Sequence, residues 1–148
     1  SLIKILNDEI CETTTRGMFV TMIVGVYDKN KNELLLSNAG HEPPLIFSKD
    51  GNFKTIDEAG PPLGIAPNFK FTEQTISFKE SSMYIFTDGI TEMKNNNGEM
   101  LGQEGFQDYI KKYQSTPNNK RLQKMIEDLI GSGRIQKDDL TIVTVDGK

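Results

Sequence analysis

Three acidic residues at the boundaries of apolar segments are best placed to do chemistry. Asp88 follows the apolar run 83–86, and Asp138 and Asp139 precede the apolar stretch that starts at Leu140. A short run without polar alternation is typical of a strand buried on both faces, so the residue beyond its end holds a defined position. Carboxylates crowded there repel one another unless a hard divalent cation such as Mg²⁺ or Mn²⁺ neutralises them. A metal site is therefore one interpretation of these residues.

The two acidic segments meet if their strands are antiparallel neighbours, because the end of one strand then lies beside the start of the other. Gly89 has no side chain, so the backbone can approach closely there and its carbonyl can serve as a further ligand. The alternative is structural. Asp-Gly is a common turn sequence and recurs at 50–51 and 146–147, and the pair 138–139 would then be a solvated cap. The residues by themselves leave both interpretations open.

Hydrophobic periodicity indicates the elements that position these acids. It predicts helices at 2–12, 103–114 and 118–131, and strands at 18–27, 33–38, 45–47, 53–56, 69–78, 83–86 and 140–145. The predicted order is one helix, six or seven antiparallel strands, two helices and a last strand. This order predicts an α+β fold with helices against sheet faces. The length of 148 residues fits a single domain over residues 1–148.

Composition narrows the function classes. With 36% apolar and 26% charged residues and a net charge of -4, the chain has no basic field for nucleic acid, and no apolar run approaches the length of a membrane span, so we expect neither partner. The single Cys11 excludes an internal disulfide, which favours a cytoplasmic setting. His41 is the only histidine, which argues against a His/Cys zinc site and leaves Ser-His-Asp catalysis little support. The start has neither an initiating Met nor a signal peptide, so we expect a piece of a longer protein.

Five segments carry a resemblance to a known family. In order they read Phe-Val-Thr-Met-Ile-Val-Gly-Val (19–26), Ser-Asn-Ala-Gly-His-Glu-Pro-Pro-Leu (37–45), Gly-Pro-Pro-Leu-Gly (60–64), Phe-Thr-Asp-Gly-Ile-Thr-Glu (86–92) and Asp-Asp-Leu-Thr (138–141). Together they resemble the PPM-type metal-dependent serine/threonine phosphatases, in the bacterial sporulation stage II protein E (SpoIIE) branch. The resemblance implies an antiparallel β-sandwich flanked by helices, the four-layer αββα type, with two metal ions at one end. This chain would be its C-terminal part, truncated at the N-terminus.

The resemblance also implies roles for individual residues. Asp88 and Asp138 match metal-binding acids of the family, Asp139 is the less favoured ligand of its pair, and Gly89 stands beside them. Supporting or structural roles are implied for His41, Asn38, Gly40, Thr87 and Thr91, the two threonines as residues that orient Asp88. In such enzymes a metal-activated water, and no protein nucleophile, attacks the phosphorus.

One family motif is absent. Relatives carry an upstream Gly-Asp-Val-Ser-Gly-His-Gly segment that supplies further metal ligands, and this chain has none. The first hypothesis is therefore part of a Mg²⁺- or Mn²⁺-dependent phosphatase acting in bacterial signalling on a phosphoprotein, an anti-anti-sigma-type regulator, with the fragment alone inactive or nearly so. The second is a non-catalytic PPM-like module that binds partners. Missing strands would also leave exposed sheet edges, through which the chain would dimerise.

Overall fold

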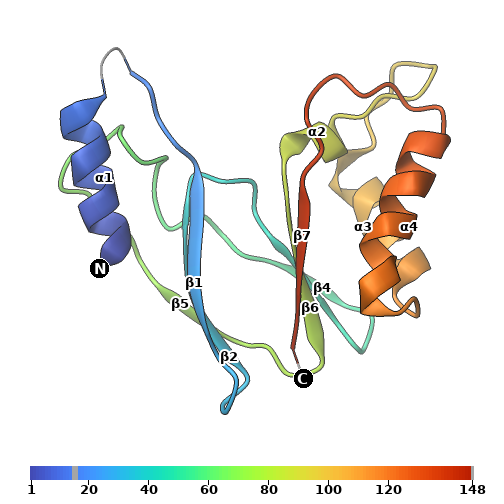
Figure 1. Ribbon diagram of the computed structural model, residues 1–148, viewed down its shortest axis with the longest axis horizontal. Coiled ribbons are helices and arrows are strands. Elements are labelled where there is room, and N and C mark those ends of the chain that lie inside the picture. Colours follow the sequence, from blue (N-terminus) through green and yellow to red (C-terminus); the bar gives the residue numbers. More distant parts are fainter. Residues whose placement is uncertain (15–16, 148) are drawn as a thin grey trace. The chain divides into compact units, whose positions relative to one another are not determined.

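The fold is known from a computed structural model of the whole chain, which describes residues 1–14 and 17–147 (Figure 1). Within these ranges the elements are α1 (Leu2–Thr13), β1 (Met22–Asp28), β2 (Glu33–Ala39), β3 (Leu45–Ser48), β4 (Phe53–Thr55), β5 (Gln74–Ser77), β6 (Ser81–Phe86), α2 (Asp88–Thr91), α3 (Gly102–Tyr113), α4 (Asn118–Gly131) and β7 (Ile142–Asp146). Helices combined with two sheets confirm the predicted α+β class.

The chain forms two compact units, and neither is one continuous stretch of sequence. The first contains Ser1–Pro43, Thr55–Ser81 and Asp146–Lys148. The second contains Pro44–Lys54 and Ser82–Val145. Each unit holds its own sheet, so each is described separately below.

The sheet of the first unit has the strand order β1-β2-β5. β1 and β2 form the predicted hairpin, paired from Met22 opposite Ala39 to Asp28 opposite Glu33. The turn between them forms because the Asp28 carboxylate accepts hydrogen bonds from the backbone N–H of Asn30 (2.9 Å) and Lys31 (3.2 Å). β5 pairs antiparallel with the other edge of β2.

Helix α1 packs its apolar face within this first unit. Ile3 is 1% exposed and clusters with Ala39 of β2 and with Leu63 of the loop between β4 and β5. Leu6 and Ile10 follow at helical spacing and pack against the same cluster. The helix is therefore fixed by its contacts with the hairpin and with that loop.

The sheet of the second unit has the strand order β4-β3-β6-β7. At one end of β6, Gly147 donates its N–H to Ser81 (2.8 Å), and at the other end Thr87 donates to Thr141 (3.2 Å). The partners are met in reverse order, so β6 and β7 run antiparallel. The end of β6 and the start of β7 consequently lie at the same edge of this sheet.

Helices α3 and α4 cover this sheet with one apolar stripe each (Figure 1). Phe106 and Ile110 lie four residues apart on α3, Met125 and Leu129 lie four apart on α4, and all four are 0% exposed. The ring of Phe86, the last residue of β6, packs 4.8 Å from that of Phe106, centroid to centroid. The strand end that precedes Asp88 is thus anchored in the core.

Three local predictions need correction. The first strand begins at Met22 rather than residue 18, because the preceding backbone pairs only at Val20, which bridges to Leu63. The strand expected at 69–78 is limited to Gln74–Ser77. The Asp-Gly pair at 88–89, expected as a strand end or turn, opens the one-turn helix α2, which a sequence of four residues is too short to reveal by periodicity.

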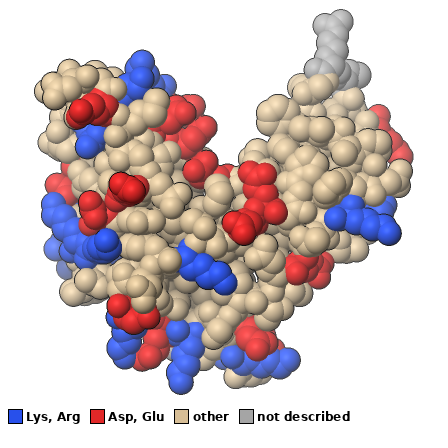
Figure 2. Space-filling model, turned by 180° about the vertical axis from the view of Figure 1, so that it is seen from behind, with Lys and Arg blue, Asp and Glu red and all other residues tan. Residues whose placement is uncertain are grey.

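The surface carries charges of both signs. On the face drawn in Figure 2, Lys and Arg side chains lie interspersed with Asp and Glu. The fields of neighbouring opposite charges offset each other, and 0.1 M salt screens the remaining field beyond a Debye length of about 10 Å. In the described ranges no helix combines the length and the apolar character needed to cross a lipid bilayer.

Candidate functional site

Asp88 is the first residue of α2 and follows the buried end of β6. Its side chain is exposed, and Thr87 precedes it in an extended conformation at the N-cap position. The Thr91 hydroxyl donates to the Asp88 backbone carbonyl at 3.1 Å, which closes the single turn. The Asp88 carboxylate therefore lies at the surface, at the start of a hydrogen-bonded turn.

Gly89 brings α2 into direct contact with the second acidic segment. A Cβ atom built on Gly89 would lie 2.4 Å from the backbone oxygen of Asp139 and 3.5 Å from the carbonyl carbon of Asp138. Any side chain at this position would collide with that backbone. The absence of a side chain at Gly89 is thus the local reason that these two segments can meet.

Thr87 ties the same two segments together. Its hydroxyl donates to the Asp139 backbone carbonyl at 3.0 Å and accepts from the Thr141 N–H at 3.1 Å. Its backbone N–H donates to the Thr141 carbonyl at 3.2 Å. These hydrogen bonds fix the backbone around Asp139, so Thr87 acts on the second acidic segment and not on the Asp88 carboxylate. We call the contacts of Thr87 and Gly89 with residues 138–141 the acidic clamp.

Asp138 and Asp139 are both exposed. One oxygen of the Asp138 carboxylate accepts the Asp139 backbone N–H at 2.7 Å, and the Gln136 side chain donates to the Asp138 carbonyl at 3.0 Å. Together with Lys137 these residues line a shallow, open hollow. The hollow is polar and lies in the same segment as the acidic clamp.

The carboxylate oxygens of Asp88, Asp138 and Asp139 have the right chemistry for Mg²⁺ or Mn²⁺, since both ions prefer hard oxygen ligands. A complete metal site needs more ligands than these residues bring together. Within residues 1–14 and 17–147, no three His, Cys, Asp or Glu side chains are arranged to hold an ion. The described residues therefore form no complete metal site, and Asp88 and Asp138 remain the predicted carboxylate ligands.

Three of the other predicted residues belong to the first unit and shape a turn. Asn38 is 1% exposed; its side chain donates to the His41 carbonyl and accepts the His41 N–H, both at 2.9 Å. Gly40 has φ +65°, and a Cβ there would lie 2.4 Å from Pro62. The His41 ring contacts the carbonyl of Glu42 at 3.1 Å. These residues hold the chain where it leaves β2.

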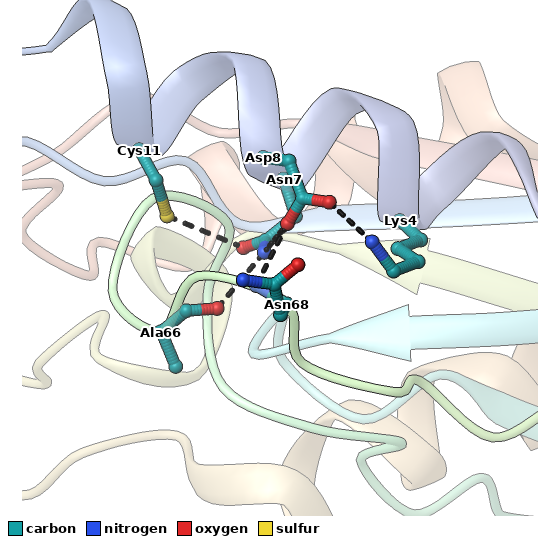
Figure 3. Close-up of polar contacts among 6 residues, drawn as sticks. All are labelled: Lys4, Asn7, Asp8, Cys11, Ala66 and Asn68. Carbon is teal, nitrogen blue, oxygen red and sulfur yellow. Dashed lines mark hydrogen bonds and ion pairs between the residues drawn. The ribbon is translucent and has the colours of Figure 1, made fainter.

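A polar hub in the first unit was missed in the sequence (Figure 3). Asn7 is 0% exposed; its side chain donates to the Ala66 carbonyl (2.9 Å) and accepts from the Gly64 N–H (3.1 Å). Next to it, the Asp8 carboxylate accepts the Asn68 N–H at 2.8 Å and pairs with Lys4. The available signal was position, because Asn7 falls four residues after the buried Ile3 on the apolar face of α1.

Hydrogen bonds within this hub favour the ionised form of the Asp8 carboxylate. The hydrogen bond from Lys4, followed by that from the backbone N–H of Asn68, lowers the pKa of Asp8 below its ordinary value. The hub joins α1 to the loop between β4 and β5 through charged and neutral hydrogen bonds together. Its role in the described structure is to hold that loop in place.

Comparison with solved structures defines the class of fold. The chain matches a structure of the PP2C phosphatase domain of SpoIIE from Bacillus subtilis with a TM-score of 0.74 and 20% identity, over 96% of this chain and 42% of that one. It matches the phosphatase domain of SpoIIE presoaked with Mn (TM-score 0.68, 19% identity, 98% and 63% covered) and RsbX in complex with magnesium (TM-score 0.67, 18% identity, 97% and 61% covered). The fold is that of PPM-type, or PP2C, phosphatase domains.

The sequence comparisons then identify the family. Residues 1–148 match the family model of Stage II sporulation protein E (SpoIIE), so the chain belongs to the SpoIIE family. It is 31% identical to Protein IcfG of Synechocystis sp. over 147 residues and 26% identical to Phosphoserine phosphatase RsbU of Bacillus subtilis over 147 residues. Each match covers 97% of this chain but only 23% of IcfG and 44% of RsbU.

Proposed function

We propose that the chain is part of a metal-dependent phosphoprotein phosphatase that removes phosphate from phosphoserine or phosphothreonine. The observation that carries the proposal is the acidic clamp, in which Gly89 and Thr87 hold the Asp88 segment against the segment of Asp138 and Asp139. Membership of the SpoIIE family supports it, as does similarity to a phosphoserine phosphatase, RsbU. Magnesium in RsbX and manganese used with SpoIIE support a divalent cofactor.

In this proposal the acidic residues bind the metal ion and Thr87 positions the backbone that carries them. Asp88 and Asp138 supply negatively charged oxygen ligands, with Asp139 and the Gly89 carbonyl as further candidates. Thr87 keeps the backbone at 139–141 in place, so that the carboxylates keep their relative position when their charge is neutralised. A bound Mg²⁺ or Mn²⁺ supplies a water of lowered pKa and positive charge for the phosphoryl oxygens. No side chain of this segment has to act as the nucleophile.

The substrate we propose is a phosphorylated regulator of the anti-anti-sigma type, in a cytoplasmic signalling pathway. The chain covers less than half of RsbU, and its described residues bring together fewer than three metal-binding side chains. We therefore expect the 148 residues alone to bind metal weakly and to release little phosphate. A longer protein that supplies the remaining ligands would be active.

The experiment compares Asp88→Asn with the control Asp108→Asn, an exposed carboxylate on α3, in the full-length protein. We expect Asp88→Asn to abolish Mn²⁺-dependent release of phosphate from a phosphoserine protein, and to weaken Mn²⁺ binding measured by calorimetry. Asp108→Asn should change neither. If Asp88→Asn retains both activity and Mn²⁺ affinity, Asp88 is not a metal ligand. Strong Mn²⁺-dependent activity of the 148 residues alone would contradict the expected weakness of the fragment.

A non-catalytic module is the second candidate, and the shortage of converging ligands favours it. It predicts that the full-length protein binds its partner but releases no phosphate at any concentration of Mg²⁺ or Mn²⁺.

Dimerisation is a separate proposal. β1 and β7 are edge strands of their sheets among the described elements, and strand edges pair readily with a second copy. Light scattering that shows a monomer over a wide concentration range would exclude it.

A further inference from the structure

Three segments of the second unit lie side by side next to the acidic clamp. Lys94 forms antiparallel bridges with Met100 on one side and with Ile135 on the other. Backbone hydrogen bonds between Lys94 and Ile135 run in both directions, at 3.3 and 2.8 Å. Residues that face each other across such bridges project their side chains to the same side. Met100, Lys94 and Ile135 therefore form one row, which we call the docking row.

The row faces away from the core. Met93 and Leu101, the sequence neighbours of Lys94 and Met100, are 1% and 8% exposed and belong to the core cluster. Alternation along an extended segment places the next residue on the opposite face. Met100 and Ile135 are accordingly 55% and 53% exposed. The core contacts of Met93 and Leu101 fix the register of the first two segments, and the backbone hydrogen bonds between Lys94 and Ile135 fix the third.

Lys94 supplies a cation between the two apolar side chains. It is half-buried, and within the described part of the chain its ammonium makes no ion pair. Lys112 on α3, by contrast, pairs with Asp128. An ammonium group without a carboxylate partner attracts an anionic side chain that comes close to it. The row thus combines two apolar contacts with one site for a negative charge.

The docking row is linked to both halves of the acidic clamp. Lys94 follows three residues after Thr91, the last residue of α2, and Ile135 precedes Asp138 by three residues. Arg134 reinforces the connection, because its guanidinium donates to the Met93 carbonyl at 3.4 Å. Because three residues span at most about 10 Å, the docking row lies close to the backbone of both acidic segments.

We propose that the docking row binds the part of the phosphoprotein substrate that flanks its phosphorylated residue, with an acidic side chain on Lys94 and apolar side chains on Met100 and Ile135. The inference rests on the proposed function, and it adds the chemistry of the preferred sequence. Neighbouring strands lie about 4.8 Å apart, so the row spans about 10 Å, and three alternate side chains of an extended peptide, which span about 13 Å, can reach it with their flexible ends. Contacts of this size give weak, transient binding, which suits a substrate that must leave.

The test uses a fluorescent peptide of the sequence Leu-Ser-Glu-Ser-Leu-Ser-phosphoserine, in which alternate residues place leucine, glutamate and leucine on one side. Binding to the full-length protein is measured by anisotropy without divalent metal, so that no hydrolysis occurs. We expect Lys94→Glu to weaken binding at least tenfold. The matched control Lys124→Glu, on an exposed position of α4, should leave it within twofold. The pair Met100→Ser and Ile135→Ser should weaken binding at least fivefold.

Charge reversal keeps the test decisive if Lys94→Glu perturbs folding. A peptide with lysine in place of glutamate should bind Lys94→Glu better than it binds the native protein. Equal loss in Lys94→Glu and Lys124→Glu, or no rescue by the lysine peptide, would overturn the docking row. Failure of the phosphatase proposal gives a different result, namely native peptide binding in a protein that releases no phosphate with Mg²⁺ or Mn²⁺.

Discussion

Gly89→Ala tests the acidic clamp most directly. The added methyl group would lie 2.4 Å from the Asp139 oxygen and 3.2 Å from the Asp139 carbonyl carbon, and real Cβ contacts essentially never fall below 3.0 Å. Both of the close atoms are backbone, so no side-chain rotation relieves the overlap. α2 and the segment at 138–141 must therefore separate, which breaks or lengthens the Thr87 hydrogen bonds.

The expected loss of stability follows from two opposing effects. Overpacking of this kind costs about 1–3 kcal/mol. Replacing glycine by alanine in a helix returns up to about 1 kcal/mol. We expect the free energy of unfolding to fall by about 1–2 kcal/mol, and the urea midpoint of the 148-residue chain to fall by about 0.5–1 M.

Gly131→Ala is the matched control. Gly131 is the last residue of α4, and an added Cβ would meet nothing within 4 Å. Only the helix preference remains, so this variant should be as stable as the native chain or more stable. The reasoning is refuted if Gly89→Ala is also as stable as the native chain, or if amide NMR signals of Asp139 and Thr141 stay unchanged in that variant.

Two further predictions concern stability. Asn7→Ala leaves two part-buried backbone groups of the loop without their hydrogen-bond partner, so the free energy of unfolding should fall by about 1–3 kcal/mol in urea titrations, while the exposed control Glu9→Ala should change little. Asp128→Asn should lower the melting temperature at neutral pH. The Lys112 hydrogen bond, then that of Tyr113, lowers the pKa of Asp128, so this contribution is present above about pH 4 and is lost as pH falls through the lowered pKa. The pKa of Lys112 is raised by the same pair, so the contribution is also lost as pH rises beyond about 10. A difference between native and Asp128→Asn melting curves that persists at pH 2 would contradict the assignment.

Elements with strong periodicity were predictable from the sequence. Helices α1, α3 and α4 and strand β2 lie within a few residues of their predicted bounds, because each buries apolar side chains at regular spacing. Helix α2 was not predictable, since its four residues are fixed by the tertiary contact at Gly89 rather than by local preference. The run 83–86 leading to Asp88 was recognisable for a different reason, as its four residues are apolar and three of them are buried.

For the candidate site, the sequence allowed the meeting of two acidic segments to be inferred from strand direction alone. The structure places Gly89 against Asp139 and shows a role for Thr87 that spacing could not indicate, because its partners are more than fifty residues away. Asn7 and the docking row were missed for a similar reason. The role of a polar residue in an apolar face, or of an exposed apolar residue, depends on contacts with residues that are distant in sequence, so local sequence does not reveal it.

The division into two compact units limits which segments of residues 1–148 can be exchanged by recombination. The chain passes between the units after residues 43, 54, 81 and 145, and three of these points fall inside strands, namely β4, β6 and β7. No single cut yields either unit complete; residues 1–81 alone would lack Gly147, which donates to Ser81 at 2.8 Å. An exchange of any one segment of this stretch would therefore leave a unit incomplete. We expect exchanges within it to be lost.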